Sequence, residues 1–234
     1  MTDRPIIFSA PMVCALLDGR KTQTRRLLEP QPDTFLVDGA ECEVQAIHIE
    51  GEAEPRIATG RCITTQKIRF AVGDRLWVKE NFVPDPSCDD DAWDDWRMSY
   101  TEWSGCGSRL RDVPDALRGP DNCYFAATAR NSTGIRWRPS IHMPRWASRL
   151  TLIVEGVKVE RLQDIDDDDA RAEGTQEPTL RTIGGELAQA AWSERQVFQR
   201  LWNSLHGPDA WDANPWIVAL SFRVVRGNID EVPA

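Results

Sequence analysis

The sequence has no apolar run of about 18 residues, the length that a membrane-spanning helix needs, so we expect no membrane partner. Its first ten residues, MTDRPIIFSA, lack the layout of a secretory signal peptide. None of the six cysteines forms a CxxC pair, and the three histidines have no recognisable metal spacing. These absences predict a reduced, cytoplasmic protein without a disulfide framework, a bound metal or a cofactor. They do not predict an oligomeric state.

The chain also lacks an excess of basic residues, because 37 acidic side chains outnumber 28 basic ones and the formal net charge is −9. A protein that coats nucleic acid non-specifically needs a wide basic surface. The composition therefore argues against that class but leaves room for a small basic pocket. Apolar residues make up 41% of the chain, enough for a core, and ten tryptophans are many for this length. Tryptophan often lies at ligand or partner surfaces.

One short stretch stands out against this acidic background. GRKTQTRR, residues 19–26, holds four cations in eight residues. It follows an apolar segment that predicts a short strand at 6–8 and then a helix, with Ser9 as N-cap and Pro11 in the first turn. Gly19 is a natural residue to end that helix, and the two threonines favour a strand that begins within the turn.

The rest of the chain predicts mostly strands. A turn and strand are expected at 70–82, further strands at 123–128, 149–162 and 214–225, and a short helix at 164–174. A longer amphipathic helix is marked by Leu187, Ala191, Val197, Phe198, Leu201 and Leu205. This order predicts a mainly β, α+β fold: a small barrel with flanking helices. We expect one domain over 1–234, with insertions near 29–66, 83–121 and 175–212.

Several of these segments together resemble the ASCH domain family. They are GRKTQTRR, VGDRLWVKE, LTLIVEGVKVERLQDI followed by DARAEG, and the closing strand WIVALSF. The longer form, with RWRPSIHMPRWASRLTL, resembles proteins of phages and prophages. The resemblance covers about half of the chain and implies a PUA-like fold, a small β-barrel that binds a nucleobase or a nucleic-acid strand.

The same resemblance implies an activity and the residues that perform it. A small bacterial member of the family is an amidohydrolase that removes the acetyl group from N4-acetylcytidine. Its proposed catalytic lysine and threonine match Lys21 and Thr24 of the turn, and its glutamate matches Glu173 within one or two residues. In such a reaction Thr24 would be the nucleophile. Lys21 would act as base or stabilise charge, and Glu173 would protonate the leaving amine.

Basic and aromatic residues provide candidate contacts to a nucleoside, RNA or DNA. Arg25 and Arg26 could clamp a phosphate. The loop at 136–149 interleaves arginine with tryptophan, as single-stranded nucleic acid or an extruded base requires. The predicted ligand contacts are Arg20, Thr22, Arg25, Arg26 and Trp77, together with Arg136, Trp137, Arg138, Arg145 and Trp146 of the loop.

Each of these assignments has a plainer alternative. Cations after a helix C-terminus are favoured by the helix dipole, the threonines suit a strand, and the arginines can pair with the many acids. Both loop tryptophans can belong to a core. Substitutions in the turn are expected to cost little, since exposed turns usually tolerate change within about 0.5 kcal/mol.

Three hypotheses for function remain open at this point. The first is a module that recognises a modified base or nucleic acid, and the second is an amidohydrolase for N4-acylated cytidine. The third is a phage-associated structural or interaction protein, suggested by the acidic, tryptophan-bearing stretch at 83–121.

Overall fold

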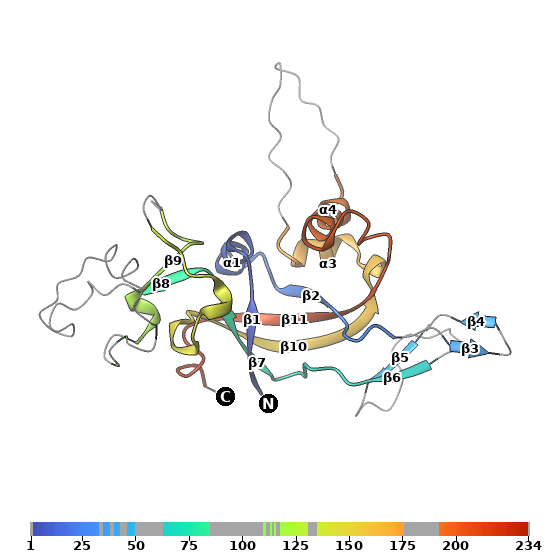
Figure 1. Cartoon of the computed structure of the whole chain (residues 1–234), viewed down its shortest axis with the longest axis horizontal. Coiled ribbons are helices and arrows are strands. Elements are labelled where there is room, and N and C mark those ends of the chain that lie inside the picture. The colour runs from blue at the N-terminus through green and yellow to red at the C-terminus, as the bar shows by residue number, and fades with distance from the viewer. Residues whose placement is uncertain are drawn as a thin grey trace, which may run out of the picture. The chain divides into compact units, whose positions relative to one another are not determined.

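The computed structural model of the chain describes residues 2–32, 35–37, 40–42, 46–49, 63–84, 110, 113, 115, 118–130, 135–175 and 192–233. Within these ranges the structure is α+β, with one main sheet and few helices (Figure 1). The predicted mainly β, α+β class is therefore confirmed. None of the helices in these ranges is long and apolar enough to cross a membrane. The third hypothesis rests on 83–121, most of which lies outside the described residues.

The main sheet has five strands in the order β1-β7-β10-β11-β2. They are β1 (Asp3–Ile7), β7 (Arg75–Lys79), β10 (Leu150–Arg161), β11 (Trp216–Arg226) and β2 (Gln23–Leu27). β1 runs parallel to β7, whereas β10 is antiparallel to β7 and β11 to β2. The sheet ends at β1 on one side and β2 on the other, so the strands of the described ranges do not close into a barrel.

The chain forms two compact units. Unit 1 contains Met1–Gly19, Gly73–Ile153 and Arg223–Ala234, and unit 2 contains Arg20–Val72 and Val154–Phe222. The two long strands, β10 and β11, contribute residues to both units.

The N-terminal predictions are confirmed closely, because they depend on local rules. Helix α1 (Ala10–Leu17) begins after Ser9, with Pro11 in its first turn. Gly19 follows its end with φ +73, a left-handed conformation that favours glycine. The strand expected to begin within the basic turn is β2.

Short strand pairs lie within or beside two of the segments expected as insertions, as far as these are described. In unit 2, β3 (Phe35–Val37) pairs antiparallel with β4 (Ala40–Cys42), and β5 (Ala46–Ile49) pairs parallel with β6 (Ile63–Gln66). In unit 1, β8 (Phe82–Pro84) pairs antiparallel with β9 (Cys123–Phe125). The described residues of 29–66 therefore include four short strands.

Two helices and a hydrophobic cluster form the core of unit 2. Helix α3 (Asp167–Ala172) begins at Asp166, whose Oδ1 accepts a bond from the Asp169 backbone N–H. Helix α4 (Glu194–His206) begins with a capping box between Ser193 and Gln196. Both predicted helices are confirmed, although Leu187 and Ala191 lie outside the described residues. The buried cluster comprises Leu162, Ile165, Ala170, Phe198, Trp202, Trp211, Ile217 and Ala219.

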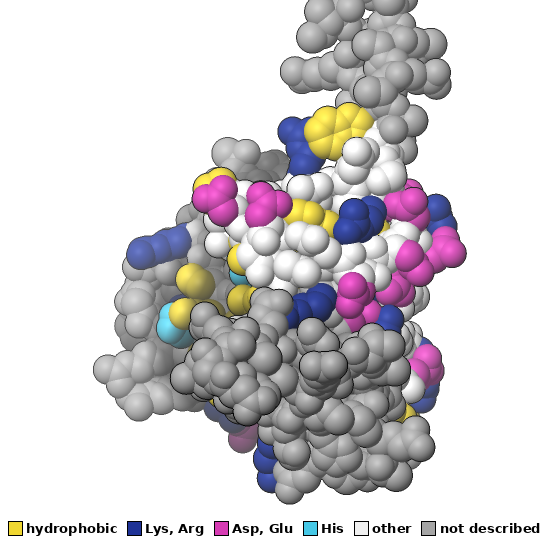
Figure 2. All heavy atoms as spheres, turned by 90° about the vertical axis from the view of Figure 1, so that its right-hand side faces the viewer, with side chains coloured by type: hydrophobic (Ala, Val, Ile, Leu, Met, Phe, Trp, Pro, Cys, Tyr) yellow, Lys and Arg dark blue, Asp and Glu magenta, His cyan; other side chains and the backbone are white. Residues whose placement is uncertain are grey.

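The described surface carries both signs of charge. Figure 2 shows one face of the molecule on which acidic and basic side chains are interspersed. On α3, Arg171 forms an ion pair with Asp168 at 2.7 Å, and both side chains are exposed. On this face, the described residues therefore present acidic and basic side chains side by side rather than a wide basic patch.

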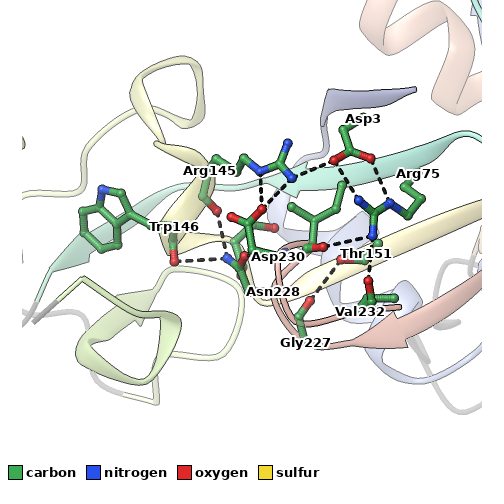
Figure 3. A network of polar contacts seen from close by, with 11 residues as sticks. Asp3, Arg75, Arg145, Trp146, Thr151, Gly227, Asn228, Asp230 and Val232 are labelled. Carbon is green, nitrogen blue, oxygen red and sulfur yellow. Dashed lines mark hydrogen bonds and ion pairs between the residues drawn. The ribbon is translucent and has the colours of Figure 1, made fainter. Parts of the chain in front are cut away.

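In unit 1, a polar network ties the N-terminal strand to the C-terminal segment (Figure 3). The carboxylate of Asp3 accepts bonds from Arg75 Nε at 2.8 Å and Nη2 at 2.9 Å, and from Arg145 Nη2 at 2.6 Å. Arg75 Nη1 also donates to the backbone carbonyl of Val232 at 2.6 Å, and Arg145 also pairs with Asp230. The hydrogen bond from Arg75 is the main reason that the pKa of Asp3 lies below its usual value; burial opposes it and Arg145 reinforces it.

We expect Asp3→Asn to lower the free energy of unfolding at neutral pH by about 1–2 kcal/mol, because charge-assisted bonds are lost. The folded pKa of Asp3 is below the unfolded one. Its stabilisation is therefore complete above the unfolded pKa, about 4, and is lost as the pH falls through the folded pKa. Urea denaturation of both proteins should show a smaller difference at about pH 2.5 than at pH 7. Equal differences at both pH values would contradict this account, and Asp230→Asn, at a more exposed position, is the matched control.

Candidate active site

The backbone brings two of the three predicted catalytic residues together, although 152 positions separate them in the sequence. Lys21 forms an antiparallel bridge with Glu173, and the Thr22 N–H donates to the carbonyl of Ala172 at 2.8 Å. Glu173 is the C-cap residue directly after α3, and Gly174, with φ +75, follows it. Both residues belong to unit 2.

The side chains of Lys21 and Glu173 form a buried ion pair. Lys21 Nζ donates to Glu173 Oε2 at 2.7 Å and to the Glu173 backbone carbonyl at 2.8 Å. The residues are 2% and 4% exposed, so solvent barely reaches the pair. The residue that makes these contacts is Glu173 itself, the one matched by the family motif, and not a residue one or two positions away from it.

Burial lowers the pKa of Lys21 from its usual value, because an ammonium group is poorly stabilised away from water. The charge and hydrogen bond of Glu173 oppose this shift, whereas the neighbouring charges of Arg26 and Arg25 add to it. The result is a lysine that releases its proton more readily than one in water, as a general base requires.

Arg25 lies beside this pair and is surrounded by acceptors. Its Nη1 donates to Gln23 Oε1 at 3.2 Å and to Glu173 Oε1 at 3.3 Å. Its Nη2 donates to Glu160 Oε1 at 3.0 Å and to Asp169 Oδ2 at 2.6 Å. A guanidinium has two hydrogens on each Nη atom, so all four are used within the protein.

The prediction that Arg25 clamps a ligand phosphate stays a prediction, and the structure shows the guanidinium engaged by side chains of the chain itself. Its side chain is 1% exposed, and its Nη donors already satisfy three carboxylates and an amide. The plainer alternative, that the arginine pairs with acids of the chain, describes its contacts. For Arg26, burial lowers the pKa from its usual value, and the charge of Glu173 opposes that shift.

Thr24, the third predicted catalytic residue, lies on β2 opposite Leu220 and is 4% exposed. Among the described residues the Thr24 hydroxyl makes no hydrogen bond. Thr24 and Lys21 are nevertheless both buried near the start of β2. The expectation that substitutions in this turn cost little stability assumed an exposed turn, whereas both of these residues are buried.

The two remaining predicted contacts of the turn flank the ion pair. Arg20 Nη1 donates to the Gly174 carbonyl at 3.2 Å, directly after Glu173. Thr22 is exposed, and its backbone bonds to Ala172 and Phe222 hold the turn in place. Their part in ligand binding stays a prediction.

The loop at 136–149 belongs to unit 1. Trp137 packs against the cluster of Val83 and Val113, and Trp146 packs against this cluster and that of Phe82, Phe125, Met143 and Ala147. Both tryptophans therefore contribute to cores, as the plainer alternative held.

The arginines of the loop, and Trp77, have varied surroundings. Arg136 is exposed and Arg138 is partly buried, while Arg145 is held by Asp3 and Asp230. Trp77 lies on β7 with Lys79 Nζ 5.4 Å from its ring centroid. A nucleic-acid surface on this loop stays a prediction, and Arg136 is its most accessible arginine.

Unit 1 also contains an open pocket of about 590 Å³. Arg149 lines it, with its guanidinium 4.0 Å from the ring centroid of Phe125. Arg149 donates from Nε and Nη2 to the buried Glu80 and from Nη1 to Thr128. None of the predicted catalytic residues lines this pocket.

Sequence reasoning missed three residues of the charge network: Gln23, Glu160 and Asp169. Asp169 belongs to the acidic run DIDDDD, residues 164–169, and lies four positions before Glu173. Residues four apart share a face of a helix, so this spacing could have linked Asp169 to Glu173. Glu160 follows the buried Val159 in a long strand, and no pattern of the sequence marks its burial.

Comparisons of the chain with protein-family models, with curated proteins and with solved structures found no match. Within the described part of the chain, no group of three or more histidine, cysteine or acidic residues is arranged to hold a metal ion.

Proposed function

We propose that this chain is an ASCH-type protein with a PUA-like fold, and that unit 2 hydrolyses the amide of an N4-acylated cytidine. The observation that carries the proposal is the buried contact of 2.7 Å between Lys21 Nζ and Glu173 Oε2. Both residues match the catalytic motif of the family that the sequence resembles. A buried lysine with a lowered pKa, hydrogen-bonded to a carboxylate, suits general acid–base chemistry.

The proposed reaction begins with proton transfer from the Thr24 hydroxyl to neutral Lys21 as the Thr24 oxygen attacks the acyl carbon. The carbon–nitrogen bond then breaks, and the exocyclic amine of cytidine takes a proton from the Lys21–Glu173 pair. Water hydrolyses the resulting ester, which releases the carboxylic acid and restores the Thr24 hydroxyl.

The contact between Lys21 and Glu173 supports these proton transfers. At 2.7 Å, a proton can pass directly between Nζ and Oε2. Glu173 can therefore supply the leaving amine with a proton drawn from Lys21, without a separate acid. Burial of Lys21 strengthens the attraction between its positive charge, once it is protonated, and the oxyanion that forms on the carbonyl oxygen of the acyl group.

A second candidate is recognition of a modified base without hydrolysis. The observation that favours it is the Thr24 hydroxyl, which makes no hydrogen bond among the described residues. A threonine without a base in contact is a weak nucleophile. In this case Lys21, Arg26 and Glu173 would provide polar contacts to the base. The chain would then share base binding with the family it resembles, but not the hydrolysis.

Incubation of the purified protein with N4-acetylcytidine, followed by chromatography of the nucleosides, separates the two candidates. Cytidine formation by the wild type, and its loss in Glu173→Gln, would support hydrolysis. Glu173→Gln keeps the shape of the side chain but neither takes up nor releases a proton. Binding of N4-acetylcytidine without turnover would support recognition, whereas neither binding nor turnover with any acylated base would contradict both.

A further inference from the structure

Arg25 was expected to contact ligand, but its hydrogen bonds suggest a different role. The guanidinium divides its Nη donors between two groups of acceptors. Nη2 is held by Glu160 on β10 and Asp169 on α3, and Nη1 by Gln23 and Glu173. A ligand phosphate would have to displace these carboxylates from a side chain that is 1% exposed.

The carboxylate of Glu173 is in turn held at both oxygens. Oε1 accepts from Arg25 Nη1 at 3.3 Å and Oε2 accepts from Lys21 Nζ at 2.7 Å. Without Arg25, the terminal torsion of a glutamate rotates over a broad range. With Arg25 in place, Oε2 stays directed at the lysine, which is the geometry that proton transfer between Nζ and Oε2 needs.

We infer that Arg25 is a positioning residue for the Lys21–Glu173 pair: it fixes the Glu173 carboxylate and, with Asp169 and Glu160, sets the charge around Lys21. The role of Arg25 in catalysis rests on the proposed function. The effect of Arg25 on the protonation of Lys21 does not depend on whether the protein is an enzyme. Arg25 thus acts through Glu173 and does not itself contact the substrate.

The charges that surround Lys21 predict opposite effects for two substitutions. Arg25 and Arg26 on β2 disfavour the ammonium form of Lys21, and Glu173 favours it. The negative charges of Asp169 and Glu160 compensate the positive charge of Arg25, and Glu160 also forms an ion pair with Lys158 on β10. Removal of the positive charge of Arg25 should make the Lys21 ammonium more stable. Removal of the negative charge of Asp169 should make it less stable.

Nitrogen NMR of the Lys21 side chain tests this directly. The Nζ signal of labelled protein is followed as the pH is raised in the wild type, Arg25→Gln and Asp169→Asn. We expect Lys21 to lose its proton at higher pH in Arg25→Gln and at lower pH in Asp169→Asn. Arg171→Gln is the matched control, since Arg171 lies on the same helix as Asp169 but is 61% exposed, and its titration should equal that of the wild type.

Two results would overturn the inference: titration of Lys21 at the wild-type pH in both variants, or shifts of the same sign in both. If Arg25→Gln does not fold, Asp169→Asn decides alone, because Asp169 is 23% exposed and asparagine keeps its shape. A downward shift in that variant then supports the role of Arg25, and no shift contradicts it.

Kinetics distinguish positioning from phosphate binding. If Arg25 positions the pair, Arg25→Gln should lower kcat by about 10- to 100-fold, with little change in KM. The decrease in kcat should be equal for N4-acetylcytidine and for its 5′-monophosphate. A phosphate clamp would instead raise KM for the monophosphate alone, and that result would overturn the assignment. If the wild type hydrolyses neither compound, the proposed function fails, while the NMR titration still decides whether Arg25 controls the pair.

Discussion

Thr24→Ala is expected to lose nearly all hydrolysis of N4-acetylcytidine, with kcat lowered by about 10²–10⁴-fold, because the variant has no oxygen to attack the acyl carbon. Thr24→Ser should keep a measurable part of the rate, since a hydroxyl remains on the same carbon. Thr24 is 4% exposed, so the serine variant also loses a buried methyl group. Melting temperatures of both variants should therefore be recorded beside the rates.

The comparison of Lys21→Arg with Lys21→Met separates base catalysis from charge stabilisation. Arginine keeps the positive charge but does not lose a proton at working pH. If Lys21 is the base, both variants should be severely impaired. In that case the wild-type rate should rise with pH through the pKa of Lys21, which burial lowers from its usual value. If Lys21 only stabilises charge, Lys21→Arg should keep much of the rate and the wild-type rate should fall over the same pH range.

Two outcomes would contradict the proposed chemistry. Hydrolysis by Thr24→Ala at the wild-type rate would exclude the threonine as nucleophile. A wild-type rate that does not change as Lys21 titrates would exclude the lysine from proton transfer. The control is Arg171→Gln, an exposed change on α3 away from the ion pair, which should leave both the rate and its pH dependence unchanged.

The elements that could be predicted from the sequence are those that local rules determine. In β7, Leu76 and Val78 alternate with Arg75, Trp77 and Lys79 and are almost fully buried, as a half-buried strand requires. Gly73 before it has φ +88, a turn conformation that the Gly–Asp pair predicted. Such rules need only neighbours along the chain, and so they do not reveal which strands become adjacent in the sheet.

The surroundings of the basic turn could not be predicted in this way. Lys21 and Arg25 belong to a turn whose substitutions were expected to cost little, on the assumption that the turn is exposed. They are buried because their partners come from β10 and α3, between 135 and 152 positions away. The family resemblance identified Glu173, whereas Glu160 and Asp169 became visible only once the fold brought them to Arg25. Long-range pairing of charges has no periodic signature in a sequence.

Because Arg25 compensates three carboxylates, Arg25→Met should be the most destabilising single change in this network. It leaves Glu160, Asp169 and Glu173 without a shared cation, and Glu160 and Glu173 are 1% and 4% exposed. Removal of one partner from a buried ion pair typically costs about 3–5 kcal/mol, because the remaining charge is uncompensated. We expect a loss in that range by urea denaturation at pH 7, and a change within about 0.5 kcal/mol for Arg171→Met.

The cause of that loss can be tested by removal of a negative charge from the variant. Glu160→Gln in the Arg25→Met background should restore part of the stability, whereas Glu160→Gln in the wild type should be destabilising, because it weakens a satisfied pair. Protonation of the uncompensated carboxylates should likewise make the deficit of Arg25→Met smaller at about pH 4.5 than at pH 7. If the two substitutions were simply additive and the deficit independent of pH, lost packing against Phe198, whose ring centroid lies 6.0 Å from the guanidinium, would explain the loss better than charge.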